Sequence, residues 1–158
     1  MGSAWADDLS EEKIKAAFAY NFARYTTWPD HAFADPSSPI ELLVFGDETT
    51  RKAFAGIHQK HVGNRKLVVR FMEPADNVHM IFFGRMVNRE QLAQALESAE
   101  GKPILTIGEQ SDFIWYGGVI NIFNKNDRFH FEINPKAVAR QGLKISSRLM
   151  KLAVLVGD

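Results

Sequence analysis

The side chains that could do chemistry in this sequence are histidines, acids and hydroxyls, because the chain contains no cysteine. Disulfides, thiolate catalysis and cysteine-based zinc sites are therefore excluded. His58 and His61 have the i, i+3 spacing that could present two ligands to one metal ion from a helix. No third ligand accompanies them, and the stretch HQKHVGN is typical of a turn. We therefore interpret both as solvated histidines and expect no metal.

The sequence pattern favours no covalent or acid–base catalysis. No GxSxG motif is present, and Ser146-Ser147 lies in a predicted helix, where hydroxyls usually serve caps or packing. The 19 acidic residues show no spacing that selects an acid and a base. No GxGxxG or Walker-type sequence follows a predicted strand, so a nucleotide-dependent enzyme ranks last among the functions considered. We expect no catalytic residue and no cofactor.

Glycines that follow three predicted strands could border a ligand site. In an open α/β sheet, the carboxyl ends of the strands often form a crevice where backbone amides bind an anion. A sensor for a nucleotide or an amino-acid-like anion is thus an alternative function. The residues of this crevice would be Gly46, Asp47, Gly84, Arg85, Gly108 and Glu109. The simpler interpretation, which we favour, is that these glycines only make tight turns.

The length of 158 residues and the apolar content of 46% indicate one domain with a single core. The 19 basic and 19 acidic residues balance, so no global positive field favours nucleic acid. No apolar run reaches the roughly 18 residues needed to cross a bilayer. Met1-Gly2-Ser3 resembles a tag remnant, and Ala4-Trp5-Ala6 resembles the end of a removed secretory signal. We expect residues 1–8 to be a disordered start and residues 9–158 to form the domain of an exported protein.

The arrangement of apolar residues predicts an α/β fold. A first helix should follow a Ser10 cap and end at Trp28-Pro29, with an apolar face formed by Ile14, Ala17, Phe18, Phe22 and Tyr25. Its several aromatic residues serve either core packing or a partner contact. Apolar runs predict strands at Ile40–Phe45, 67–71, Met80–Phe83, 104–107, 119–123 and 129–133. With helices between them, these strands predict a mixed, mostly parallel sheet that ends in an antiparallel hairpin.

The last segment predicts a helix that starts at Pro135, followed by a second helix with two stripes. An apolar stripe, expected to face the core, contains Ile145, Leu149, Leu152 and Val156. A basic stripe contains Lys144, Arg148 and Lys151. The basic stripe is either a solvated helix edge, which is the usual case, or a docking edge for an acidic partner or an anionic ligand, and both interpretations stay open.

Sequence segments over nearly the whole chain resemble the YfiR-like family of bacterial periplasmic regulatory proteins. They are AAFAYNFARYTTWP at 16–29, VFGD at 44–47, IFFGR at 81–85, PILTIGE at 103–109, GGVINIF at 117–123 and FEINPKAVARQGLKISSRLMKLA at 131–153. The last segment is the most specific of these. The resemblance implies a Rossmann-like sandwich that is exported to the periplasm, is often dimeric and has no catalytic activity.

The resemblance also implies a partner. A family member binds the periplasmic sensing domain of an inner-membrane diguanylate cyclase, lowers cyclic di-GMP synthesis and thereby restrains biofilm formation. Transferred by motif, the residues expected to contact the partner are Glu132, Asn134, Val138, Lys144 and Arg148. Family members often carry a cysteine before the histidine of the central strand, where this chain has Val78 before His79. Disulfide-based redox control is therefore excluded here.

Overall fold

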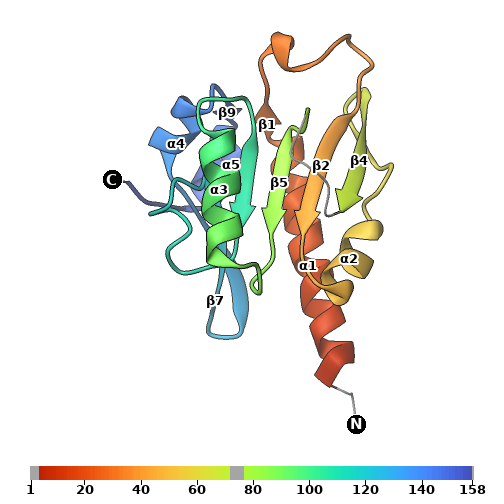
Figure 1. Ribbon diagram of the computed structural model, residues 1–158, viewed down its shortest axis with the longest axis vertical. Coiled ribbons are helices and arrows are strands. Elements are labelled where there is room, and N and C mark those ends of the chain that lie inside the picture. The colour runs from red at the N-terminus through yellow and green to blue at the C-terminus, as the bar shows by residue number, and fades with distance from the viewer. Residues whose placement is uncertain (1–3, 72–76, 158) are drawn as a thin grey trace.

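The computed structural model describes residues 4–71 and 77–157, and it shows a central sheet with helices on both faces (Figure 1). The sheet has eight strands in the order β10-β8-β7-β6-β5-β2-β4-β3, and a separate ribbon pairs β1 with β9. The strands are β1 (Thr26–Thr27), β2 (Ile40–Phe45), β3 (His61–Val62), β4 (Arg65–Phe71), β5 (Met80–Phe83), β6 (Leu105–Gly108), β7 (Ile120–Lys125), β8 (Arg128–Ile133), β9 (Lys144–Ile145) and β10 (Val154–Leu155). The helices are α1 (Ala4–Arg24), η1 (Asp30–Ala32), α2 (Glu48–Ala55), α3 (Arg89–Ala99), α4 (Pro135–Arg140) and α5 (Ser147–Leu152).

Strand directions confirm the predicted mixed, mostly parallel sheet. The five central strands, β4, β2, β5, β6 and β7, all run parallel. Strand β8 returns antiparallel to β7. Asn126 and Asp127 make the turn between them with φ angles of 54° and 61°, as a two-residue hairpin turn requires. The α/β class and the hairpin near the C-terminus are therefore both confirmed.

Alternate side chains of the central strands enter two hydrophobic cores, one on each face of the sheet. Leu42 and Val44 of β2 join the core covered by α1, α2, α4 and α5. Leu43 and Phe45 join the core covered by α3. In Figure 1, α3 accordingly lies on the opposite face of the sheet from α1. Burial on both faces explains why the central strands are continuous apolar runs in the sequence.

Helix α1 differs from its prediction in extent. It begins at Ala4, so it includes residues 4–8, which the sequence placed outside the domain. It ends at Arg24 instead of Trp28-Pro29. The Thr26 hydroxyl donates to the Phe22 carbonyl at 2.7 Å, and Thr26 itself pairs with Ile145 in the β1–β9 ribbon. This pairing takes the chain out of the helix before the proline.

The buried face of α1 is also rotated from the predicted one. Ile14 is 46% exposed, whereas Lys15 is only 2% exposed. The fully buried apolar positions are Ala16, Ala19, Phe22 and Ala23. Three of these are alanines, whose small side chains carry little weight in an apolar pattern but allow the helix to pack closely on the sheet. The prediction was right for Phe22 and wrong for Ile14 and Ala17, which are exposed. The buried alanines were missed because an apolar pattern is dominated by the larger side chains.

The predicted second C-terminal helix is present as α5, but it is shorter than the predicted apolar stripe, which runs from Ile145 to Val156. Residues 144–155 form strand β9, the short helix α5 and strand β10. Ser146 caps α5 by accepting a hydrogen bond from the Arg148 amide at 3.2 Å, and Ala153 is extended and ends the helix. Val154 and Leu155 then pair with β8. The expected apolar stripe is therefore divided, and Leu152 is 75% exposed instead of facing the core.

Candidate functional site

Two of the three glycines predicted to border a ligand crevice, Gly46 and Gly84, meet at the carboxyl ends of the central strands. A recess there is lined by Glu12, Gly46, Asp47, Thr50, Gly84, Arg85, Met86 and Glu109. Its volume is about 20 Å³, which is room for about one water molecule and no nucleotide. Gly108 packs elsewhere, because a Cβ atom on it would lie 2.5 Å from the Phe113 ring. The geometry therefore gives ligand binding at these residues no support and agrees with the interpretation of turn and packing glycines.

The same recess contains a buried ion cluster that the sequence analysis did not identify. Lys15 Nζ, on α1, donates to Glu12 Oε1 and to Glu109 Oε1, each at 2.7 Å. The Thr50 hydroxyl donates to Glu12 Oε2 at 3.3 Å. Glu109 follows β6, so the cluster joins α1 to the sheet. The Asp47 side chain is also engaged, because it caps α2 by accepting from the Thr50 amide at 2.9 Å.

Burial and pairing act in opposite directions on the ionisation of this cluster. Burial lowers the pKa of Lys15, but the hydrogen bonds and charges of Glu109 and Glu12 outweigh it, and the pKa lies above 10.5. Burial raises the pKa of Glu109 above 4.5, with Lys15 opposing the shift and the charge of Glu12 adding to it. Lys15 is thus a firmly held cation with two carboxylates around it. A net negative cluster of this kind disfavours a bound anion.

The histidine pair predicted to be solvated is not arranged as a metal site. His58 follows α2 and its Nδ1 accepts a hydrogen bond from the Val69 amide at 3.0 Å. His61 lies in β3, so the two do not share a helix. In residues 4–71 and 77–157, no group of three or more histidine, aspartate or glutamate side chains could hold a metal ion.

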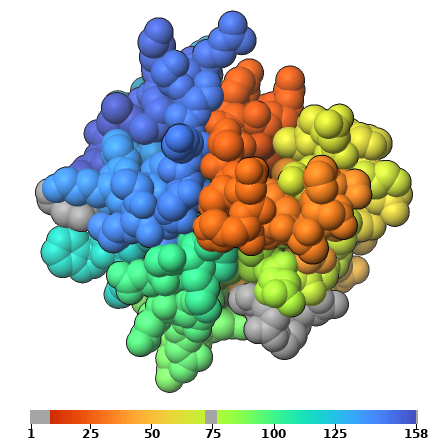
Figure 2. All heavy atoms as spheres, turned by 90° about the horizontal axis from the view of Figure 1, so that it is seen from above, coloured from red at the N-terminus to blue at the C-terminus, as the bar shows by residue number. Residues whose placement is uncertain are grey.

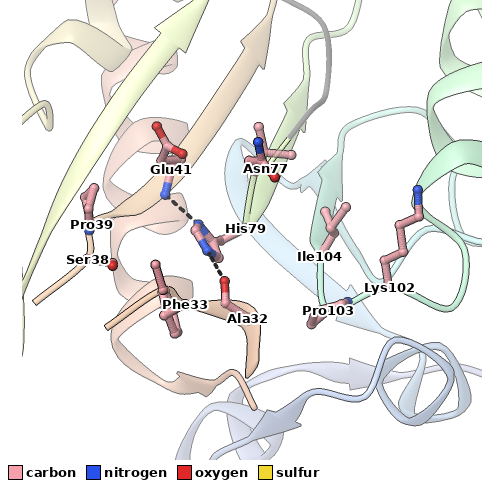
Figure 3. Close-up of a pocket in the computed structure, with 12 residues that line it drawn as sticks. Ala32, Phe33, Ser38, Pro39, Glu41, Asn77, His79, Lys102, Pro103 and Ile104 are labelled. Atoms are coloured by element: carbon pink, nitrogen blue, oxygen red, sulfur yellow. Dashed lines mark hydrogen bonds between the residues drawn. The ribbon is translucent and has the colours of Figure 1, made fainter. Parts of the chain in front are cut away.

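A larger pocket opens at the amino ends of β2, β5 and β6 (Figure 3). It encloses about 770 Å³. Its walls come from the segment before β2, the start of β5 and the turn before β6. They consist of Ala32, Phe33, Ala34, Ser38, Pro39, Glu41, Asn77, Val78, His79, Lys102, Pro103 and Ile104. The ligand crevice predicted from the sequence lies at the opposite end of the sheet, at the carboxyl ends of the strands.

His79 links that pocket wall to the segment before β2. Its Nδ1 accepts from the Glu41 amide at 3.0 Å, so Nδ1 carries no proton, and Nε2 donates to the Ala32 carbonyl at 2.9 Å. The Phe33 ring stacks on the imidazole at 4.5 Å. Burial lowers the pKa of His79 below 6.5, against the hydrogen bond to Ala32. His79 is therefore a neutral structural link and its ring nitrogens are both occupied.

Two of the predicted partner-binding residues are buried. Asn134 has no exposed surface and caps α4 by accepting from the Lys136 amide at 3.0 Å. Val138 is 6% exposed and belongs to the core beneath α4. The geometry gives no support to direct contact of these two side chains with a partner, because both are buried in this structure. Asn134 caps α4 and Val138 anchors it to the core, so both hold in place the C-terminal segment.

The other three predicted partner-binding residues reach the surface to different extents. Glu132, in β8, is half-buried and accepts from Asn121 Nδ2 at 3.2 Å. Lys144 in β9 and Arg148 in α5 are exposed. They belong to a larger set that the sequence analysis recognised only in part. Between Asn134 and Gly157 the chain has five basic residues and no acidic one, and all five are exposed: Lys136, Arg140, Lys144, Arg148 and Lys151.

We call these five residues the basic face. Figure 2 shows the C-terminal segment, in blue, gathered on one side of the molecule beside the segment that precedes β2, in orange. The overall charge of the chain is zero, so the remainder carries a compensating excess of acids. The whole-chain balance hides this asymmetry, which a count by segment would have found.

Within the described residues, no helix is long and apolar enough to cross a bilayer. A family model described as YfiR/HmsC-like matches residues 12–154, which is most of the chain. Members of this family are typically periplasmic and are generally non-catalytic regulators. The α/β fold agrees with this match, and so does the FEIN segment, which ends β8 and caps α4. This chain belongs to the YfiR/HmsC-like family.

Proposed function

We propose that this protein is a non-catalytic periplasmic regulator that binds the periplasmic sensing domain of an inner-membrane diguanylate cyclase. Binding would hold the cyclase inactive, lower cyclic di-GMP and so restrain biofilm formation. Family membership supports the regulatory class, and the exposed basic face is the single observation that supports partner binding. Five exposed basic residues in a stretch of sequence without an acidic residue, in a chain of zero net charge, favour an acidic surface on the partner.

The two exposed residues from the family motif, Lys144 and Arg148, are the proposed contacts. They lie on either side of Ser146, in β9 and at the start of α5. The β1–β9 ribbon fixes β9 through the pair Thr27↔Lys144. Since the backbone of both residues is ordered by secondary structure, a partner would meet them with little loss of chain entropy. Glu132 is half-buried and would lie at the rim, where its negative charge would have to meet a basic or hydrogen-bond-donating group of the partner.

The cellular test uses the exported protein together with a diguanylate cyclase that carries a periplasmic domain. Cyclic di-GMP, measured by mass spectrometry of cell extracts, should fall when the parent protein is present. The double variant Lys144→Glu, Arg148→Glu should leave cyclic di-GMP near the level without regulator, because reversed charges repel an acidic surface. A matched variant, Lys66→Glu with Lys125→Glu, changes exposed lysines outside the basic face and should act as the parent does.

An unchanged cyclic di-GMP level with the correctly exported parent protein would contradict the proposed function. Equal repression by the parent and the Lys144→Glu, Arg148→Glu variant would leave the function standing but remove the basic face from it. Periplasmic location is read in the same cells by fractionation.

Small-molecule sensing is the second candidate function, and the pocket beside His79 is the observation that favours it. Its volume of about 770 Å³ is in the range of small-molecule sites. Glu41 and Lys102 place opposite charges on its walls (Figure 3). A thermal-shift screen of nucleotides and amino acids tests it, and a compound that stabilises the parent but not Lys102→Glu would support it.

The homodimer implied by the family resemblance stays a prediction. Light scattering coupled to size-exclusion chromatography would give twice the monomer mass of 17.8 kDa if it forms.

A further inference from the structure

Strand β10 lies at one edge of the eight-stranded sheet. It pairs with β8 in parallel, with Val154 opposite Glu132 and Leu155 opposite Ile133. The Val156 amide continues this pairing by donating to the Ile133 carbonyl at 2.9 Å. In a strand, the backbone groups of successive residues face opposite neighbours. The amide and carbonyl of Leu155 therefore face away from β8, towards the open edge.

The β10 edge is unusually apolar. Leu152, Val154 and Leu155 are 75%, 51% and 54% exposed. Natural sheets normally protect an edge with charges, prolines, bulges or a covering element. Within the described residues, the protection of β10 is its shortness alone, because its two residues are both aliphatic and the exposed residue that precedes them is Leu152. An edge of this composition is suited to accept another strand.

The opposite edge of the same sheet, β3, is protected. The Tyr20 hydroxyl donates to the His61 carbonyl at 2.6 Å, which occupies an edge acceptor with a side chain. Lys60 lies over the Tyr20 ring at 5.2 Å. Charged and polar residues therefore close this edge. The contrast indicates that the openness of β10 is particular to that side of the molecule.

The basic face identifies the kind of strand that would fit at β10. Arg148 and Lys151 are exposed on α5, directly before the edge strand. Docking two copies of the chain through this side would bring together two sets of five positive charges. A segment with aliphatic residues and flanking acids would instead satisfy both the apolar edge and the neighbouring cations.

A second group of exposed apolar residues lies in two loops of the molecule. Trp115 is 87% exposed and Met86 is 80% exposed, in the loops that follow β6 and β5. Arg89 Nη1 and Asp112 Oδ2 form an ion pair there at 2.6 Å, so these two charges neutralise one another. The charges around that patch have both signs, since Arg85 and Glu90 are exposed there as well. The residues next to the β10 edge, Arg148 and Lys151, are both positive and therefore favour an acidic occupant.

We propose that the regulated partner adds a strand to β10: an extended, acid-flanked aliphatic segment of the partner pairs with the outward amide and carbonyl of Leu155. This inference rests on the proposed function and specifies how the partner is held. Backbone pairing gives affinity in this mode, and the side chains at Leu152 and Val154 give apolar contact. The basic face then orients the acidic flanks of the added strand.

The test compares two substitutions at one position in binding to the purified periplasmic domain of the diguanylate cyclase. Leu155→Pro removes the outward amide while leaving the ladder to β8 intact, because that ladder uses the neighbouring residues. Leu155→Ala keeps the amide and shortens the side chain. Strand addition predicts that the dissociation constant rises about tenfold or more for Leu155→Pro and about threefold or less for Leu155→Ala. Circular dichroism and thermal unfolding verify that both variants fold.

Amide hydrogen exchange gives a second readout that needs no variant. The Leu155 amide should exchange rapidly in the free protein and become protected in the complex. Equal loss of binding by the two variants, or a Leu155 amide that stays unprotected in the complex, would overturn strand addition while leaving the proposed function in place. No binding by the parent protein would overturn the proposed function and this inference with it. A parent dimer that Leu155→Pro converts to monomers would instead assign the edge to a second copy.

Discussion

Two groups of charged residues in this molecule contrast in almost every respect. The cluster of Glu12, Lys15 and Glu109 is buried at the carboxyl ends of the strands, and its lysine has two carboxylate partners at 2.7 Å. The basic face is exposed on the C-terminal segment and has no acidic residue in its own stretch of sequence. One group holds a helix to the sheet, and the other presents charge to solvent.

The contrast shows that residue type alone does not separate folding from recognition. Lys15 and Lys144 are both lysines, but Lys15 is 2% exposed and ion-paired, whereas Lys144 is exposed in β9. A buried cation without its partners is costly, whereas an exposed one contributes little to stability. Substitutions in the first group should therefore change stability, and substitutions in the second should change binding.

The largest expected effect is on stability and comes from Lys15→Met. The substitution keeps the volume of the side chain but leaves Glu12 and Glu109 buried together without a cation. We expect the free energy of unfolding to fall by about 3–5 kcal/mol. Urea denaturation followed by circular dichroism measures it.

Lys151→Met is the matched control for that prediction, because it makes the same change on the basic face. A loss below about 1 kcal/mol for Lys15→Met would contradict the assignment of the buried cluster as a stabilising link between α1 and the sheet.

A second prediction separates binding from stability on the basic face. Arg148→Glu should raise the dissociation constant for the cyclase domain about tenfold or more, because an exposed cation facing an acidic surface becomes an anion. The affinity of the parent protein should also fall steeply as salt is added, because screening weakens contacts between exposed charges. Biolayer interferometry at two salt concentrations measures both effects. Affinity that does not change with salt would count against an electrostatic contact.

A third prediction concerns His79, which is buried like Lys15 but is held neutral. Its folded pKa lies below the ordinary 6.5, so on acidification the unfolded chain takes up a proton before the folded protein does. The stability contributed by His79 is present above about pH 6.5 and is lost as the pH falls from there towards the folded pKa, by about 1.4 kcal/mol for each unit between the two values.

Thermal unfolding of the parent protein and of His79→Gln between pH 8 and pH 5 measures this difference. The parent should lose more stability than the variant over the acidic half of the range. Parallel curves for the two proteins would contradict a pKa of His79 that is lowered by burial.

The smallest expected effect is that of Lys151→Met on stability. Its free energy of unfolding should stay within about 0.5 kcal/mol of the parent, as is usual for exposed side chains. The melting temperature in the same buffer as Lys15→Met verifies this. A shift as large as that of Lys15→Met would mean that the basic face is part of the fold.

The strands were the most predictable part of the structure. Continuous apolar runs such as Ile40–Phe45 are buried on both faces, so their composition alone reveals them. The C-terminal segment was less predictable, because a two-residue strand such as β10 depends on pairing with β8 and has too few residues to set its own period. Long-range pairing is invisible to a pattern read along the chain.

The candidate site was predictable only in part. Lys144 and Arg148 were identified, and both are exposed, but Asn134 and Val138 proved to be buried. A motif specifies which residues recur together. It does not distinguish exposed residues that can contact a partner from buried residues that support them. Lys15 was missed because its carboxylate partner Glu109 lies 94 residues away and only the fold brings the two together.

The central claim is that the exposed C-terminal basic residues bind the cyclase domain without contributing to the fold. Isothermal titration of that domain with the parent protein, with Lys144→Glu, Arg148→Glu and with the control Lys66→Glu, Lys125→Glu tests it most directly. We predict a dissociation constant about 10- to 100-fold higher for the first double variant alone, with equal melting temperatures for all three proteins. Equal affinities for the two double variants would contradict it.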